Sequence, residues 1–463
     1  MARLPVIAIF DVGKTNKKLF LFDEHYRIVY EKTARFLETI DEDGDVCENL
    51  DSIRISVFES LNEVLRSNLY ELVAINFSTY GASLVYLDNN GQPVAPLYNY
   101  LKPYPADLES QFYATYGGKT QKALETSSPA SGNLNAGMQL YRMKYQDPER
   151  FKKVRWAIHL PQYVSYLISG KIFSDMTSIG CHTQLWDFKK KRYHDWVLQE
   201  GLDEILPPIM PSDEAIEATF MGQRYIVGTG LHDSSAALIP YQMSFKEPFV
   251  LLSTGTWCIS MNPFNASPIT AEELENDCLA YIGYHGKPIK ASRLFAGNEH
   301  EQQVKRIAAA FEVDAIIFRN MEFDPELVLK LRQNESIKPE QHGQDSGKSS
   351  VFQYRSIGQF SNAAEAYHQL ILDLVALQQQ STRMIMEGTA VKKIFVDGGF
   401  SKNAIYMNLL SAAFPDIEVY AAGMAQATAL GTAMSIHKHW NKKPLANDII
   451  ELKYYSVKNQ ISL

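Results

Sequence analysis

Three glycine-containing turns are the parts of this sequence whose chemistry suits a phosphorylated ligand. Asp11 follows the apolar run 6–10 and opens a polar turn that ends at Lys18. A carboxylate placed there could hold Mg²⁺ while backbone N–H groups and hydroxyls meet phosphate oxygens. The turn Ser253–Thr256 is similar in composition, and Asp397–Asn403 connects an apolar strand to a helix. Any one of them is more readily explained as an ordinary tight turn, because turns favour the same residue types, but three in one chain favour phosphate binding.

Two well-known nucleotide-binding motifs are excluded. Gly13-Lys14-Thr15 would need an earlier glycine at the position of Ala8, which lies inside the apolar run, so this turn is not a P-loop. Residues 398–403 lack the GxGxxG spacing of a dinucleotide-binding turn. The prediction of phosphate binding therefore depends on the hairpin turns themselves.

One acidic residue, Asp233, is the candidate for proton transfer. It follows Gly230-Leu231-His232, and a carboxylate at such a turn could accept a hydroxyl proton during phosphoryl transfer. Residues 234–239 could equally begin a helix, so the sequence by itself favours a helix cap at Asp233 and a hydrogen-bonded turn residue at His232. His437 and His439 are two positions apart and cannot share a helix face, which excludes a metal-binding pair there.

Alternating strands and helices must position these residues. Pro5–Asp23 has two apolar runs around a polar loop, which predicts a β-hairpin, and a third strand follows at Arg27–Lys32. Asp51–Ser67 has apolar residues at a period near 3.6, which predicts an amphipathic helix before the strand Leu72–Phe77. Alternation of this kind predicts an α/β sheet.

The second half of the chain repeats the opening pattern. Phe249–Met261 again has an apolar strand, a small polar turn and a second strand, which suggests two related lobes with a boundary near residues 240–248. Asn362–Met386 is predicted to be a long helix, and Lys393–Val396 a buried strand.

Three further segments have weaker patterns. Glu149–Lys171 is predicted to be helical around Pro161, and the Pro-rich stretch Gly201–Pro211 to be a connection. Asn334–Ser350 is polar and poor in apolar residues, which predicts an exposed loop.

Composition and charge narrow the class of protein. The chain has 463 residues, of which 46% are apolar and 21% charged, as expected for a folded protein of two or three domains. Its net charge of -8 gives no basic field that would attract nucleic acid or an anionic membrane. Four cysteines without CxxC spacing indicate reduced thiols, and no apolar run is long enough for a signal peptide or a membrane span. The sequence therefore predicts a cytoplasmic protein.

The turns, in their order and spacing, resemble the motifs of the FGGY family of carbohydrate kinases, in the actin, Hsp70 and hexokinase superfamily. The resemblance covers nearly the whole chain and includes Phe10–Gly13, Leu252–Trp257, Val396–Asn403 and Ala425–Gly431. It implies an α/β fold of two ribonuclease-H-like lobes with a cleft between them. Residues 1–243 would form the lobe that binds sugar and carries the first phosphate motif, and residues 244–463 the lobe that binds ATP.

The resemblance also implies roles for individual residues. Asp233 would be the general base, with Gly81 and His232 touching the sugar. Asp11 would hold Mg²⁺ or its water network. The remaining set would contact ATP: Thr15, Asn16, Lys18, Gly255, Thr256, Gln302, Gly399 and Asn403. The resemblance leaves a homodimer open, and no interface pattern stands out in the sequence.

Within the family, the sequence is most similar to the rhamnulokinase and L-fuculokinase branch. The similarity lies in Ser78–Gly81, Leu160–Lys171, Gly230–Asp233 and Ser253–Trp257. It implies a kinase that transfers the γ-phosphoryl group of ATP to a ketose, and it favours the 1-hydroxyl of a 6-deoxy-ketohexose such as L-fuculose or L-rhamnulose.

Three departures from that branch bear on the substrate. Gly81 is followed by Ala82-Ser83 where Val-Asp is usual, which removes an acidic group near the expected sugar. Lys18 stands in place of an arginine, and Lys102 lacks the usual acidic neighbour. A kinase for xylulose, ribulose or another polyol is therefore the alternative, followed by a nucleotide-switched binding protein of the same superfamily.

Overall fold

The computed structural model describes residues 3–14, 17–34, 36–333, 349–423, 426–445 and 449–456. The contacts divide the chain into two compact units. The first contains residues 1–243, 280–288 and 426–449, and the second contains residues 244–279, 289–425 and 450–463. The predicted loop Asn334–Ser350 lies outside the described residues except for its last two positions.

A mixed sheet forms the centre of the first unit. Its strands run in the order β13-β14-β6-β1-β2-β3, and β15 also pairs with β6. β1 and β2 form the predicted antiparallel hairpin, and β6 runs parallel to β1. The strands predicted at Arg27–Lys32 and Leu72–Phe77 are confirmed as β3 and β6. The bounds are β1 Leu4–Val12, β2 Lys17–Asp23, β3 Ile28–Thr33, β6 Tyr70–Thr79, β13 Ala215–Phe220, β14 Gln223–Gly228 and β15 Leu231–His232.

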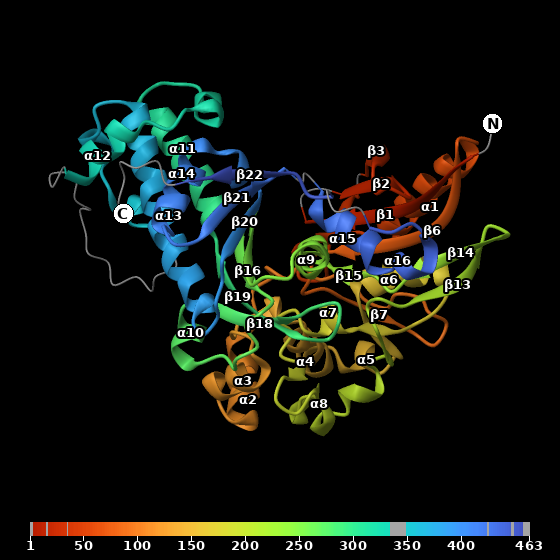
Figure 1. Cartoon of the computed structure of the whole chain (residues 1–463). Coiled ribbons are helices and arrows are strands. Elements are labelled where there is room, and N and C mark those ends of the chain that lie inside the picture. The colour runs from red at the N-terminus through yellow and green to blue at the C-terminus, as the bar shows by residue number, and fades with distance from the viewer. Residues whose placement is uncertain are drawn as a thin grey trace. The chain divides into compact units, whose positions relative to one another are not determined.

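Helices cover both faces of this sheet (Figure 1). The side chains of Val6, Ala8 and Phe10 share a core with α1 (Leu50–Arg66) and α6 (Leu160–Ser169). α15 (Ala427–Ser435) packs against β1 and β6 and has no residue in that core, so it covers the opposite face. Both faces of β1 are therefore buried, which explains its continuous apolar run.

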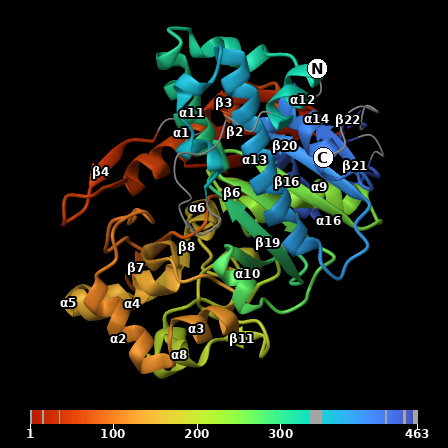
Figure 2. The ribbon, with the colours of Figure 1, turned by 90° about the vertical axis from the view of Figure 1, so that its left-hand side faces the viewer.

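The chain between β6 and β13 builds a second layer in the first unit, with its own core. Figures 1 and 2 show α2, α3, α4 and α8 gathered together beyond the sheet. Phe112, Tyr141 and Trp196 are fully buried there and stack edge to face. The bounds are β7 Leu84–Leu87, α2 Ala106–Tyr116, α3 Lys119–Thr126, α4 Ala136–Gln146, α5 Pro148–Phe151, β8 Trp156–His159 and α8 Asp195–Gln199.

The prediction of one helix over Glu149–Lys171 is wrong in part. A short helix, α5, and the strand β8 precede α6, and β8 pairs with β7. Pro161 lies in the first turn of α6, where the missing N–H of proline costs nothing. The proline therefore marks the start of a helix instead of a point inside one.

The second unit contains its own mixed sheet, ordered β18-β19-β17-β16-β20-β21-β22. The predicted hairpin over Phe249–Met261 is confirmed as β16 and β17, and the predicted long helix as α13 (Ala363–Met386). α13 packs on α14 (Ala404–Ala413) and α11 (Ala296–Ala310). The strands are β16 Phe249–Thr254, β17 Cys258–Asn262, β18 Cys278–Ile282, β19 Pro288–Leu294, β20 Lys393–Gly398, β21 Glu418–Ala422 and β22 Leu452–Tyr455.

Two further sequence predictions concern the cysteines and membrane-spanning helices. All four cysteines are free thiols and are buried, as the sequence predicts. Among the described helices, none is both long enough and apolar enough to span a membrane.

Candidate active site

Asp233 stands where β15 gives way to α9 (Asp233–Ser244). Its Oδ1 accepts a hydrogen bond from the backbone N–H of Ser234 at 2.6 Å and lies 3.1 Å from Nε2 of His232. The Asp233 side chain is 31% exposed, while that of His232 is 5% exposed. The carboxylate thus begins a helix and is also within reach of a ligand, so the helix-cap interpretation and the catalytic one are compatible at this position.

The turn that carries Asp233 is held from two directions. Oδ1 of Asn76, on β6, accepts the N–H of Gly230 at 3.1 Å, and the amide of the same side chain donates to the carbonyl of Thr432 at 2.9 Å. From α6, Gln162 donates to the carbonyl of Gly230 at 2.9 Å, and Ser165 donates to that of Gly228 at 2.7 Å. These bonds explain why a glutamine and a serine follow Pro161 in the motif Leu160–Lys171.

Gly230 has to be glycine for two reasons. Its φ is +81°, and a Cβ atom would lie 2.6 Å from the carbonyl oxygen of Pro161. Any side chain would push the turn away from α6. The glycine therefore fixes the approach of the segment that ends in Asp233.

A fully buried carboxylate holds the backbone of His232. Thr177 Oγ1 accepts the N–H of His232 at 3.0 Å and donates to Oδ1 of Asp175 at 2.6 Å. Asp175 also accepts the N–H of Ser178 at 2.8 Å and caps α7 (Met176–Ile179). This buried charge is satisfied by hydrogen bonds, and it makes the position of His232 rigid.

His232 is arranged to orient Asp233. Its Nε2 lies 3.1 Å from both Asp233 Oδ1 and Cys181 Sγ, and its Nδ1 lies 3.3 Å from Ser235 Oγ. Desolvation lowers the pKa of His232, although the charges of Asp233 and Asp175 act in the opposite direction. A neutral ring with its hydrogen on Nε2 donates to the carboxylate and accepts from the serine hydroxyl. The predicted contact of His232 with sugar stays a prediction.

Gly81 lies directly against this histidine. A Cβ atom on Gly81 would be 2.4 Å from Cys181 Sγ and 3.2 Å from Cδ2 of His232, so a larger residue would displace both. The next residue, Ala82, has φ +58°, which an L-residue adopts at a cost. The structure thus brings together Gly81, His232 and Asp233, which are far apart in the sequence.

Asp11 and Lys18 face each other at the end of the β1–β2 hairpin. Asp11 Oδ1 accepts a hydrogen bond from Ser78 Oγ at 3.0 Å. Desolvation and then the charge of Asp233 raise the pKa of Asp11 to about 7, against smaller opposite effects of Ser78 and Lys18. The ammonium of Lys18 also contacts Glu31 at 2.5 Å. Thr15 and Asn16, at the tip of the hairpin, lie outside the described residues.

A large cavity in the second unit gathers the other two turns. Its volume is about 980 Å³, and it is lined by residues of β16, α11 and α13, by residues 314–320, and by the turn that connects β20 to α14. Gly255, Gly399 and Asn403 are among the lining residues, whereas Thr256 and Gln302 are not. Gln302 is exposed on α11, where its amide donates to Asn298 Oδ1 at 2.8 Å. The other lining residues include His300, Val304, Lys305, Ile316, Phe318, Arg319, Asn320, Tyr367, Phe400 and Lys402.

Backbone packed against backbone forms one end of this cavity. A Cβ atom on Gly297 would lie 1.8 Å from the carbonyl oxygen of Gly255. Gly398 has φ +88°, and its Cβ atom would lie 1.9 Å from the carbonyl oxygen of Thr254. The Thr254 hydroxyl accepts the N–H of Phe400 at 3.0 Å and donates to the carbonyl of Asp397 at 2.5 Å. The two turns are therefore held together by close backbone packing and by the Thr254 hydroxyl, and glycine allows the backbone to approach this closely.

Family models match both halves of the chain. Residues 6–239 match the model of the N-terminal domain of the FGGY family of carbohydrate kinases, and residues 246–444 match that of carbohydrate kinase FGGY, C-terminal domain. The chain belongs to the FGGY family of carbohydrate kinases. It is an ATP-dependent sugar phosphotransferase with two lobes of the actin and hexokinase type, as the resemblance predicts.

Individual relatives agree with this assignment. A rhamnulokinase from Mannheimia succiniciproducens is 24% identical over 461 residues, which cover 92% of this chain and 88% of the relative. The structure of a carbohydrate kinase from Novosphingobium aromaticivorans matches with a TM-score of 0.80 at 21% identity, covering 100% of this chain and 96% of the other. A ligand-bound xylulose kinase from Lactobacillus acidophilus matches with a TM-score of 0.77 at 15% identity, covering 98% and 94%. At these identities the solved structures establish the fold.

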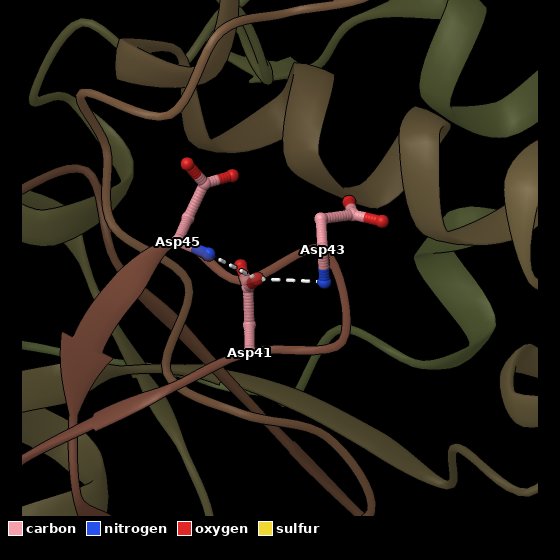
Figure 3. A group of neighbouring side chains, drawn as sticks. All are labelled: Asp41, Asp43 and Asp45. Atoms are coloured by element: carbon pink, nitrogen blue, oxygen red, sulfur yellow. Dashed lines mark hydrogen bonds between the residues drawn. The ribbon is translucent and has the colours of Figure 1, made fainter.

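Lys102, which lacks the acidic neighbour usual in the rhamnulokinase and L-fuculokinase branch, forms a buried ion-pair cluster with three aspartates. Its side chain is 2% exposed, and its ammonium lies 2.5 Å from Asp41, 2.7 Å from Asp43 and 3.3 Å from Asp45. Figure 3 shows the three aspartates around one turn, where Asp41 accepts the backbone N–H groups of the other two at 3.0 Å each. The Lys102 ammonium occupies the place that a metal cation would have in such a cluster, and the aspartates neutralise the charge of the lysine.

Two groups of residues in this FGGY kinase are not apparent from the sequence. Cys181 contacts His232, and Asn76, Gln162 and Thr177 position the turn before Asp233. His300 and Tyr367 line the cavity of the second unit. A histidine in the polar run AGNEHEQQ after β19 is the only sequence signal for the second group, and it does not indicate a partner.

The residues around Asp11 suit a hard cation. Desolvation and then the charge of the nearby Asp233 carboxylate raise the pKa of Asp11, so two carboxylates act on one another here. Carboxylate oxygens are ligands that Mg²⁺ prefers, and a cation would relieve their repulsion. The donor set therefore fits the Mg²⁺ that sugar kinases of this kind use with ATP.

Proposed function

We propose that this kinase transfers the γ-phosphoryl group of ATP to the 1-hydroxyl of a 6-deoxy-ketohexose, either L-rhamnulose or L-fuculose, with Asp233 as the general base. The observation that carries the proposal is the arrangement of Asp233. Its carboxylate is reachable, is oriented by a neutral His232, and stands at a turn fixed by Asn76 and Gln162. Phosphoryl transfer depends on alignment and charge neutralisation, and a carboxylate needs only to accept the hydroxyl proton as attack proceeds.

The first unit would bind the sugar. Gly81 and His232 lie next to Asp233 and would form the wall against which the sugar rests. Asp11 would hold Mg²⁺, directly or through water. When bound, Mg²⁺ neutralises negative charge on the phosphate oxygens. Lys18, with Thr15 and Asn16 of the same hairpin, would contact the phosphates.

The second unit would bind the nucleotide. Gly255 and Gly399 present backbone to the cavity, and Asn403 contributes an amide beside them. We place ATP in this cavity, with Thr256 and Gln302 near its opening. Residues 1–243 would thus carry the sugar-binding role and residues 244–463 the ATP-binding role, in a cytoplasmic enzyme.

The sugar class is supported by the name of the rhamnulokinase relative, and xylulose or another ketose is the alternative. The sequence Ala82-Ser83 lacks the acidic residue usual in that branch, and Ser83 is 2% exposed. Because the branch that phosphorylates 6-deoxy-ketohexoses usually has an acidic residue at this place, Ser83 weakens the case for a deoxy sugar and supports the alternative. The xylulose kinase from Lactobacillus acidophilus has the same fold, so the fold does not separate these substrates.

A coupled ADP-release assay tests the proposal. Purified protein with MgATP is given L-rhamnulose, L-fuculose, L- and D-xylulose, L- and D-ribulose or glycerol. Strong stimulation by one deoxy-ketose supports the proposal. Stimulation by a pentulose alone would change the proposed substrate but leave the proposed role of Asp233 as general base. ATP turnover that responds to no sugar, from protein that is folded and binds ATP, would contradict the substrate class.

A further inference from the structure

We propose that Tyr367 and His300 are positioning residues that hold the amide of Asn403 in the nucleotide cavity. All three side chains line that cavity. Tyr367 lies on α13, His300 on α11, and Asn403 at the N-cap of α14, and both α11 and α14 pack on α13 (Figures 1 and 2). The inference rests on the proposed nucleotide site, and it adds residues for which the sequence motifs give no role.

A directional chain of hydrogen bonds joins the three residues. Oδ1 of Asn403 accepts the backbone N–H of Tyr406 at 3.0 Å and caps α14, which fixes the other end of the amide as the NH₂ group. That NH₂ group donates to Tyr367 Oη at 2.8 Å. The tyrosine hydroxyl is then left to donate its own hydrogen to Nε2 of His300, 3.0 Å away.

This series of hydrogen bonds requires a neutral His300. Only an imidazole without a hydrogen on Nε2 can accept from the tyrosine hydroxyl. Burial lowers the pKa of His300 to about 4, with a small opposite effect of Glu301, so the ring is neutral at physiological pH. Its edge packs against Phe400 at 5.1 Å between ring centroids, which fixes the ring plane.

This series of hydrogen bonds leaves one N–H of the Asn403 amide available to a ligand. An amide NH₂ group has two hydrogens, and the bonds recorded among the described residues use one of them, toward Tyr367. The other is available to an acceptor in the cavity, such as a ribose oxygen or a ring nitrogen. Nearby, Ile316 is apolar yet 58% exposed, and the ring of Phe318 lies tilted against that of Tyr367, with 4.8 Å between the centroids. An apolar wall beside a fixed donor suits the nucleoside part of ATP.

The position of the Asn403 amide therefore depends on the hydroxyl of Tyr367. Without Oη of Tyr367, the NH₂ group and His300 Nε2 both lose their partner, and the Asn403 side chain gains freedom. Binding of ADP or ATP should weaken about tenfold, the effect of one hydrogen bond. The turnover number with saturating ATP should hardly change, because these three hydrogen-bonded side chains are proposed to hold the nucleoside part of ATP and to take no part in phosphoryl transfer.

The test compares Tyr367→Phe with Tyr406→Phe in the full-length protein. Tyr406 is a matched control, since it is 1% exposed and its hydroxyl is without a recorded partner among the described residues. The measurements are ADP affinity by calorimetry, KM for ATP, KM for the sugar, kcat, and the unfolding midpoint without nucleotide. We expect Tyr367→Phe to weaken ADP binding and raise KM for ATP about tenfold, with kcat and sugar KM kept, and Tyr406→Phe to match the wild type.

Variants at His300 provide the second measurement and cover the case in which Tyr367→Phe does not fold. His300→Leu removes the acceptor and should weaken ADP binding, and His300→Gln, which retains an acceptor, should restore most of the affinity. Tyr367→Phe combined with His300→Leu should weaken binding no more than either alone, because both break one chain.

The two levels of the proposal fail differently. ADP affinity equal to that of the wild type in Tyr367→Phe, or an equal loss in Tyr406→Phe, would overturn the positioning role. A wild-type protein that binds no ADP would instead contradict the nucleotide site itself.

Discussion

Replacing Asp397 with asparagine should raise the free energy of unfolding above neutral pH and leave it unchanged below about pH 4. Asp397 ends β20 in the second unit, is 7% exposed, and accepts the N–H of Gly398 at 2.7 Å. Burial raises its pKa to about 7, although that hydrogen bond and the charge of Lys402 act in the opposite direction. Asparagine has the same shape, keeps the acceptor oxygen and cannot ionise.

The size of the effect follows from the shift in pKa. The ordinary value is 3.8, so the shift to about 7 is about three units, which corresponds to about 4 kcal/mol at 1.36 kcal/mol per unit. Relaxation of the site around the ionised group reduces this, and a gain of about 1 to 3 kcal/mol is expected. Because the pKa is raised in the folded state, the folded protein binds more protons than the unfolded one between about pH 4 and 7. The free energy of unfolding of the wild type therefore falls across that range.

The assay is urea unfolding of the full-length protein without nucleotide, at pH 5 and at pH 8.5. The gain of Asp397→Asn over the wild type at pH 5 should be about a third of the full value that it reaches at pH 8.5, because pH 5 lies about one unit above the ordinary pKa of 3.8 and two below the raised one. Asp416→Asn, at an exposed position of the same unit, serves as the control and should give similar small differences at both pH values. A gain that is equal at both pH values, or a loss at pH 8.5, would refute the reasoning from burial.

Three other substitutions test the rest of the structure. Asp233→Asn should lower kcat by about 10²- to 10⁴-fold while calorimetry still detects sugar binding, and an unchanged kcat would remove Asp233 from the mechanism. Gly431→Ala would place a Cβ atom 1.9 Å from the carbonyl oxygen of Ala236, and should cost about 2 kcal/mol or more in denaturant unfolding, whereas Gly358→Ala, where the nearest atom is 4.0 Å away, should be neutral. Lys102→Met removes the cation beside Asp41 and Asp45, while Asp43 keeps Arg142, and should cost about 3 kcal/mol; millimolar Ca²⁺ should raise the unfolding midpoint of the variant but not of the wild type.

The sequence predicts the features of this fold that depend on short-range patterns. The hairpin β1–β2 and helix α13 follow from the spacing of apolar residues within single segments, and the structure confirms both. The strand at 156–159 was not predicted, because a short apolar run next to a helix has no period that distinguishes strand from helix. Only its pairing with β7, distant in sequence, decides its conformation.

The candidate site could be predicted only as far as single residues reveal their chemistry. Asp233 and the glycine turns are visible as types and spacings. The contact of Cys181 with His232 joins residues 51 positions apart, and that of His300 with Tyr367 joins residues 67 positions apart. Nothing in either local sequence indicates the partner, since such pairs are created by the packing of separate elements.

The side chain of Asn76 has a consequence for the order in which the enzyme can become complete during synthesis. It joins β6, the turn at Gly230 and the carbonyl of Thr432, so it connects parts of the chain separated by more than 350 residues. A nascent chain that has reached residue 243 has made Asp233 but lacks α15, which packs on β1 and β6. The face of that sheet that α15 covers would still be open, a state that favours aggregation and binding by chaperones. The first unit therefore matures only when nearly the whole protein has left the ribosome.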